Sequence, residues 1–137
     1  MGQPVVEFWQ VSKRFGDVVA VDRNDLTVEP GEFLSILGPS GCGKTTSLRM
    51  MAGFEQPSEG RVLIDGKDVT GVPAYQRPVN MVFQHYALFP HLSVADNVSY
   101  GLRQRQPRPG SAELAKAVSD ALAMVRLSGF ESRRSHE

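Results

Sequence analysis

The sequence predicts an α/β fold, in which strands and helices alternate early and helices dominate late. Runs of β-branched and aromatic residues recur before residue 84, and apolar residues recur with helical spacing after residue 93. Between an apolar run and a helical pattern lies a glycine-rich loop at 38–43. Apolar residues make up 41% of the 137 residues and charged residues 22%, which argues against a disordered chain. One α/β domain, or part of a larger one, is expected.

The strand patterns lie in the first part of the chain. Residues 5–11 (VVEFWQV) are rich in β-branched and aromatic side chains, and the runs 18–21 and 26–28 indicate a second strand with a break between them. Residues 32–37 (EFLSIL) are nearly continuous in apolar character, which is typical of a strand buried in a parallel sheet. Further strands are predicted at 61–65 and 79–83.

Three helices are predicted from their spacing and end signals. Residues 44–52 carry apolar residues at helical spacing, with Gly53 placed to end the helix. Ser93 precedes a second helix, with Asp96 three residues on as a capping-box-like partner. Ser111 is expected to cap a third, amphipathic helix, whose shared apolar face consists of Leu114, Val118, Leu122 and Val125.

Composition and charge exclude several classes of protein. Fifteen Lys and Arg residues balance fifteen Asp and Glu residues, so no nucleic-acid partner is expected on the basis of net charge. No apolar stretch approaches the roughly 18 residues of a membrane span, and the N-terminus has no secretory signal pattern. The single cysteine, Cys42, excludes an internal disulfide framework and indicates a reducing cytosol.

The strongest motif is the run 38–45 (GPSGCGKT), which matches G-x-x-x-x-G-K-[ST] between a predicted strand and a predicted helix. Glycines let successive amides surround phosphate oxygens, and the helix N-terminus adds unpaired donors. Lys44 would reach the β- and γ-phosphates, and the Thr45 hydroxyl would bind Mg²⁺. A glycine turn that happens to precede a helix is the alternative. The predicted nucleotide-binding residues of the loop are Gly38, Pro39, Ser40, Gly41, Cys42, Gly43, Lys44, Thr45 and Thr46.

Several segments resemble the nucleotide-binding subunit of ABC transporters. They are the loop 40–46 followed by LRMMAG at 48–53, the stretch VNMVFQ at 79–84, and YALFPHLSV at 86–94. The resemblance covers nearly the whole chain in the family's order. It implies a P-loop NTPase core with an attached antiparallel β portion, the start of an α-helical subdomain, and ATP with Mg²⁺ as ligands. The expected domains are a nucleotide-binding core at 1–92 and the start of the helical subdomain at 93–137.

The same resemblance assigns roles to two residues outside the loop. Gln84 matches the family's Q-loop glutamine, which implies contact with Mg²⁺ and the attacking water, and a catalytic role beside Lys44. Phe15 in Lys13–Gly16 (KRFG) matches the A-loop aromatic that stacks on adenine. Taken alone, Gln84 would rather be interpreted as a polar residue at a strand end, and the alternative for Phe15 is a half-buried aromatic beside a turn.

Residues 85–94 resemble the surface that receives the permease. Tyr86, Leu88 and Phe89 form an apolar cluster beside Pro90, as a docking groove requires, although such residues could equally belong to a core. The family's partners are then permease subunits, a second ATP-binding subunit and, indirectly, a periplasmic solute-binding protein. The implied location is peripheral, on the cytoplasmic face of the cell membrane.

Within the family, the stretches at 77–80 and 85–91 look most like importers of polyamines such as spermidine and putrescine. Ferric-iron, sugar and oxyanion importers carry similar stretches. Rival interpretations are another P-loop enzyme, such as a small kinase, and a non-catalytic module that holds nucleotide or binds the permease. A kinase would leave Gln84 and the Leu-Phe-Pro-His stretch unexplained.

Two family motifs are imitated but not matched. Residues 127–129 (LSG) begin like the signature motif, but Phe130 follows where the family has glycine. Residues 62–65 (VLID) end in Asp like a Walker B strand, but they precede Gln84 and are followed by Gly66. The resemblance therefore implies a chain that stops before the signature, and we expect it not to turn over ATP by itself.

Overall fold

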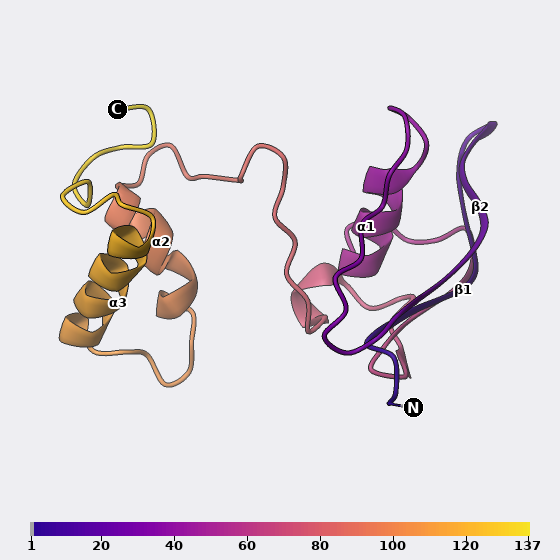
Figure 1. Cartoon of the computed structure of the whole chain (residues 1–137), viewed down its shortest axis with the longest axis horizontal. Coiled ribbons are helices and arrows are strands. Elements are labelled where there is room, and N and C mark those ends of the chain that lie inside the picture. Colours follow the sequence, from indigo (N-terminus) through magenta and orange to yellow (C-terminus); the bar gives the residue numbers. More distant parts are fainter. Residues whose placement is uncertain (1) are drawn as a thin grey trace. The chain divides into compact units, whose positions relative to one another are not determined.

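The computed structural model describes residues 2–137, which form two compact units. The first unit ends at Met81 and the second comprises Val82–Glu137 (Figure 1). Each unit is described by itself below. The domain division expected from the sequence, 1–92 and 93–137, stays a prediction.

The first unit is built on a four-stranded antiparallel sheet with the strand order β2-β1-β3-β4. β1 pairs with a strand on each side: its Phe8 lies opposite Leu26 of β2 and opposite Val62 of β3. This sheet is the antiparallel β portion that the family resemblance implied. Its strands are β1 (Val6–Phe15), β2 (Val18–Val28), β3 (Glu59–Ile64) and β4 (Lys67–Asp68).

The prediction of a break in the second strand is wrong, because β2 runs without interruption through its polar middle. The irregularity lies in the ladder instead, where the register between β1 and β2 shifts between Phe8 and Val11. Gln10 has a positive φ of 51° there, and its amide donates to the Asp25 carboxylate at 2.7 Å. A side-chain acceptor therefore replaces a missing backbone partner, and the polar residues stay in the strand.

Helix α1 (Lys44–Ala52) has the predicted bounds and lies against the sheet (Figure 1). Gly53 ends it in the left-handed conformation, with φ 81°, and its amide donates to the Met50 carbonyl. Apolar side chains of the helix and sheet form the core of this unit together with Val69. The buried members are Phe8, Val11, Val21, Met50, Val62, Ile64 and Val69.

A buried arginine closes the C-terminal end of α1. Arg77 is only 5% exposed and follows a short 3₁₀ helix, η1 (Ala74–Gln76). Its guanidinium donates to the carbonyls of Met50 at 2.7 Å and Met51 at 3.0 Å, and also to Val72 at 2.8 Å. The first two carbonyls belong to the last turn of α1, where a helix leaves carbonyls without an amide four residues on, and Val72 lies in the segment after β4. Arg77 therefore ties the end of α1 to the segment that follows the sheet.

The strands predicted at 32–37 and 79–83 do not form, so these two predictions are wrong. Phe33 and Leu37 are instead 93% and 90% exposed. The apolar pattern was read correctly, but a strand needs a neighbour to pair its backbone groups. Among the described residues no strand lies hydrogen-bonded beside either segment.

The second unit contains helices α2 (Val94–Arg103) and α3 (Ser111–Met124). The predicted cap is confirmed: the Ser93 hydroxyl accepts from the Asp96 amide at 3.1 Å, and it donates to the Asp96 carboxylate at 2.8 Å. No helix among the described residues is both long and apolar enough to cross a membrane.

The start of α3 differs from the prediction by one residue. Gly110 is the capping residue, in an extended conformation, and Ser111 is already helical without a side-chain capping bond. The expected apolar face is confirmed in its middle, where Val118 and Leu122 are buried. Val125 is exposed, since it lies beyond the last helical residue and no longer follows the helical period.

Candidate functional site

The glycine-rich loop leads directly into α1, and its backbone conformation depends on glycine. Gly43 caps the helix with φ 89°, and no side chain forms a capping hydrogen bond. A Cβ atom at Gly43 would lie 2.3 Å from the Ala20 carbonyl oxygen of β2. Only glycine therefore allows the loop to run this close to the sheet.

The first turn of α1 presents unpaired backbone donors. The Ser47 amide is the first to bond within the helix, to the Gly43 carbonyl at 2.8 Å. Within residues 2–137, no acceptor meets the amides of Lys44, Thr45 or Thr46. Together with the positive end of the helix dipole, three such amides form an anion-binding site.

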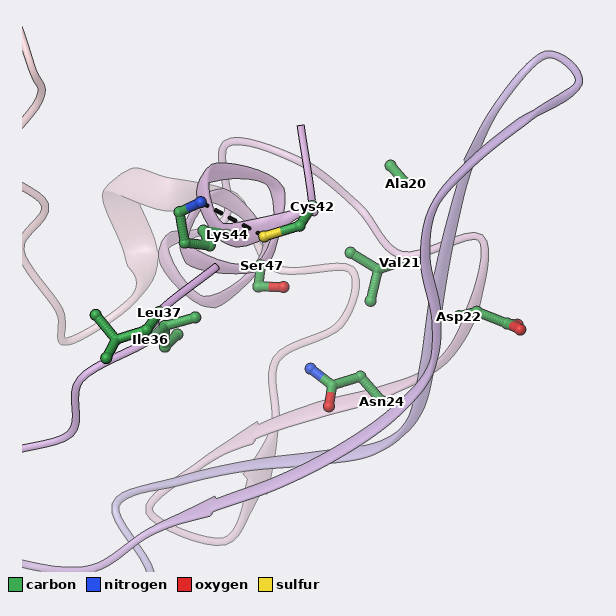
Figure 2. Close-up of a pocket in the computed structure, with 10 residues that line it drawn as sticks. Ala20, Val21, Asp22, Asn24, Ile36, Leu37, Cys42, Lys44 and Ser47 are labelled. Atoms are coloured by element: carbon green, nitrogen blue, oxygen red, sulfur yellow. Dashed lines mark hydrogen bonds between the residues drawn. The ribbon is translucent and has the colours of Figure 1, made fainter. Parts of the chain in front are cut away.

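The Lys44 ammonium is folded back over the loop. It donates to the carbonyls of Gly38 at 2.5 Å and Pro39 at 2.7 Å, and it lies 3.4 Å from the Cys42 sulfur (Figure 2). Both acceptors are neutral carbonyl oxygens, so a phosphate oxygen would be a stronger partner for the same ammonium. The Thr45 side chain is exposed beside it. This set of donors fits a polyphosphate, and the Thr45 hydroxyl fits a bound Mg²⁺.

A pocket of about 280 Å³ opens beside the loop, between β2 and the start of α1 (Figure 2). The Asn24 side chain of β2 points toward it, and the Cys42 sulfur lies at its edge. The loop thus borders open space, and a ligand can reach Lys44 without displacing core side chains. The pocket is lined by Ala20, Val21, Asp22, Asn24, Ile36, Leu37, Cys42, Gly43, Lys44 and Ser47.

Phe15 ends β1 in the same unit as the loop. It pairs with Val18 across the tight turn, and it is 48% exposed. The Lys13 ammonium lies 4.9 Å from the centroid of its ring. An exposed aromatic face of this kind can stack on a flat heterocycle. Its contact with adenine stays a prediction.

Gln84 belongs to the second unit, where it begins an exposed turn at 84–87. The turn has positive φ values at Tyr86 (59°) and Ala87 (51°), and the Tyr86 amide donates to the Phe83 carbonyl. Gln84 is exposed rather than packed at a strand end. Its role toward Mg²⁺ and water stays a prediction.

The proposed permease-contact residues lie on the surface of the second unit. Tyr86, Leu88 and Phe89 are all exposed to some degree, with Tyr86 the most exposed. The Phe89 ring packs on Tyr100 at a centroid distance of 4.6 Å, and the Asn97 side chain bonds the Phe89 amide and carbonyl. The segment is therefore held by α2 through Phe89, while Tyr86 and Leu88 are more exposed. The permease contact itself stays a prediction.

The model of the ABC transporter family matches residues 21–137. The chain belongs to the ABC transporter family. Proteins named spermidine/putrescine import ATP-binding protein PotA are similar to it: that of Rubrobacter xylanophilus is 56% identical over 97% of this chain, and that of Acidothermus cellulolyticus is 58% identical over 92%. The chain spans about a third of the length of these relatives, since the matches cover 35% and 32% of them.

Solved ABC cassettes share the fold. The dimeric post-hydrolysis structure of the ATP-binding cassette MJ0796 bound to ADP and Pi superposes with a TM-score of 0.84 at 28% identity, over 96% of this chain and 62% of that one. The ATP-binding cassette MJ1267 gives a TM-score of 0.80 at 25% identity, over 98% and 58%. The α/β fold class expected from the sequence is confirmed.

Two residues of this ABC-family chain were missed by sequence reasoning. Lys13 stands two positions before Phe15, so alternation along a strand places both side chains on one face. That signal was available in the sequence. Arg77 gave no local signal, because its carbonyl partners Met50 and Met51 lie 27 and 26 residues away.

Proposed function

We propose that this chain is the ATP-binding part of an ABC importer subunit, with Mg²⁺ and ATP held at the loop 38–46. The observation that carries the proposal is the set of unpaired amides at Lys44, Thr45 and Thr46, beside an ammonium held only by neutral groups. This combination is suited to a polyphosphate and to few other ligands.

Each residue has a defined task in this proposal. The loop amides and the Lys44 ammonium bind and orient the β- and γ-phosphates, and they stabilise the charge on the phosphate oxygens. The Thr45 hydroxyl holds Mg²⁺, and Phe15 stacks on adenine. When bound, Mg-ATP supplies the phosphoryl group whose transfer to water drives transport.

The substrate class proposed for the whole importer is a polyamine such as spermidine or putrescine. The names of the relatives at 56% and 58% identity support it. The proposed partners are permease subunits that dock on Tyr86, Leu88 and Phe89, and a second ATP-binding subunit. A periplasmic solute-binding protein acts through the permease. In this arrangement the chain works at the cytoplasmic face of the membrane.

The nucleotide proposal is tested by equilibrium binding of Mg-ATP to the purified chain. Lys44→Ala is expected to weaken binding by about tenfold or more, because a charge-assisted hydrogen bond to phosphate is lost. Lys67→Ala is the matched control, since it removes an exposed lysine from β4 of the same unit. Equal binding by the Lys44→Ala and Lys67→Ala variants contradicts the site.

The substrate class is tested by deleting the gene that encodes this chain and measuring uptake by the cells. Uptake of labelled spermidine and putrescine is expected to fall, while uptake of ferric iron and maltose stays unchanged. A loss confined to iron or sugar uptake would assign the chain to another importer of the family.

A further inference from the structure

The Lys13 ammonium contacts three groups in the first unit. It pairs with the Glu55 carboxylate at 2.6 Å and donates to the Gln56 carbonyl at 2.8 Å. It also lies 4.9 Å from the centre of the Phe15 ring. Its side chain is only 13% exposed, which is unusual for a lysine unless it is paired.

These contacts join two parts of the proposed nucleotide site. Glu55 and Gln56 follow the C-terminal end of α1, and the Glu55 amide donates to the Arg49 carbonyl of that helix. Phe15 ends β1 on the other side of the ammonium. A single charge therefore links the helix that carries the phosphate loop to the aromatic ring.

The backbone around this ammonium is fixed from both sides. The Ser58 amide donates to the Ser12 carbonyl at 2.8 Å, and the Arg14 amide donates to the Ser58 hydroxyl at 3.1 Å. Hydrogen bonding to Lys13 holds the pKa of Glu55 below its ordinary value, so this carboxylate is ionised at neutral pH. The ammonium thus has little freedom to leave the ring.

We propose that Lys13 is a positioning residue that holds the Phe15 ring for a nucleotide base. The proposal rests on the proposed function, in which Phe15 stacks on adenine and the loop binds the phosphates. The cation occupies one face of the ring, and the 48% exposure of Phe15 leaves ring surface for a base. Through Glu55, Lys13 also sets the position of the ring relative to α1.

The test compares two ligands that share the phosphates and differ in the base. The affinities of Mg-ATP and Mg-tripolyphosphate are measured for the full chain and for Lys13→Met, which keeps most of the length of the side chain and removes its charge. Binding of Mg-ATP is expected to weaken about three- to tenfold, as for loss of a cation–π contact and its ion pair. Binding of Mg-tripolyphosphate should stay within about twofold.

Two further variants sharpen the result. Lys13→Arg should restore Mg-ATP binding, because a guanidinium can both stack on the ring and pair with Glu55. In a Phe15→Leu background, Lys13→Met should have no further effect, since no ring is left to position. The ratio of the two affinities does not depend on the folded fraction. If Lys13→Met fails to fold, the same ratio of Mg-ATP affinity to Mg-tripolyphosphate affinity is measured for Lys13→Gln.

The outcomes separate this inference from the proposed function. Equal losses for both ligands, or no loss for Mg-ATP, overturn the role of Lys13 while Lys44→Ala still weakens binding of both ligands. Mg-ATP binding that is as tight in Lys44→Ala as in the Lys67→Ala control overturns the proposed function itself. A loss specific to Mg-ATP that disappears in the Phe15→Leu background supports the positioning role.

Discussion

Replacing Arg77 with methionine is expected to weaken the first unit, because it removes the donors at the C-terminal end of α1. Arg77 makes three hydrogen bonds of 2.7–3.0 Å, to the carbonyls of Met50, Met51 and Val72. Burial lowers the pKa of its guanidinium, but an arginine stays charged at neutral pH. The bonds are therefore charge-assisted, and of the three carbonyls the Met50 carbonyl keeps the Gly53 amide as a partner once the guanidinium is gone.

The size of the effect follows from these bonds. Hydrogen bonds to a charged group contribute roughly 1.5–3 kcal/mol each, and removing the guanidinium also relieves its cost of burial. We expect a net loss of about 2–4 kcal/mol in the free energy of unfolding. For a unit of this size the unfolding midpoint would fall by roughly 10–25 °C.

The assay is urea unfolding followed by fluorescence of Trp9, the single tryptophan, which lies in β1. Arg14→Met is the matched control, because Arg14 is exposed and its side chain makes no hydrogen bond or ion pair within the described residues. The stability of Arg77→Lys should be intermediate. The lysine ammonium lacks the planar fork of a guanidinium and cannot reach all three carbonyls. If Arg77→Met lies within about 0.5 kcal/mol of Arg14→Met, the reasoning is refuted.

Three other predictions concern local features. Ser93→Ala removes the cap of α2 and should lower the free energy of unfolding by about 1 kcal/mol, measured by thermal unfolding followed by circular dichroism. Substitution of the exposed Ser119 with alanine is the control and should have no such effect. Hydrogen bonding to the Ser93 hydroxyl, and then to Arg103, holds the pKa of Asp96 below its ordinary 3.8, so the separate stabilisation from this carboxylate is complete above that pH and disappears as pH falls through the lower folded-state pKa. Unchanged acid sensitivity in Ser93→Ala would contradict this. Amides at 33–37 should exchange with solvent much faster than those of β1, and comparable protection would show that the segment is paired. Alkylation of the exposed Cys42 should slow when Mg-ATP is added, and an unchanged rate would place the nucleotide elsewhere.

Features that depend on neighbouring residues in the sequence were predicted well. The bounds of α1, its end at Gly53 and the cap formed by Ser93 and Asp96 all rest on signals within four residues. The phosphate loop is likewise contiguous, so its motif and its place before α1 were both readable.

Features that depend on distant partners were not predictable in the same way. The segment 32–37 has the composition of a buried strand. Composition does not show whether another strand lies beside it to pair with its backbone. The bridge from Lys13 to Glu55 and the cap formed by Arg77 join residues far apart along the chain. Phe15 and Gln84 were assigned through the family resemblance, since neither carries a sufficient local signal.

The central claim is that the first turn of α1 binds the phosphates of ATP. The most direct measurement is nuclear magnetic resonance of the isotope-labelled chain during a titration with Mg-ATP. The amide resonances of Gly43, Lys44, Thr45 and Thr46 are predicted to shift and to saturate together, while those of β4 stay in place. Saturating Mg-ATP that leaves these four amides unshifted would contradict the account.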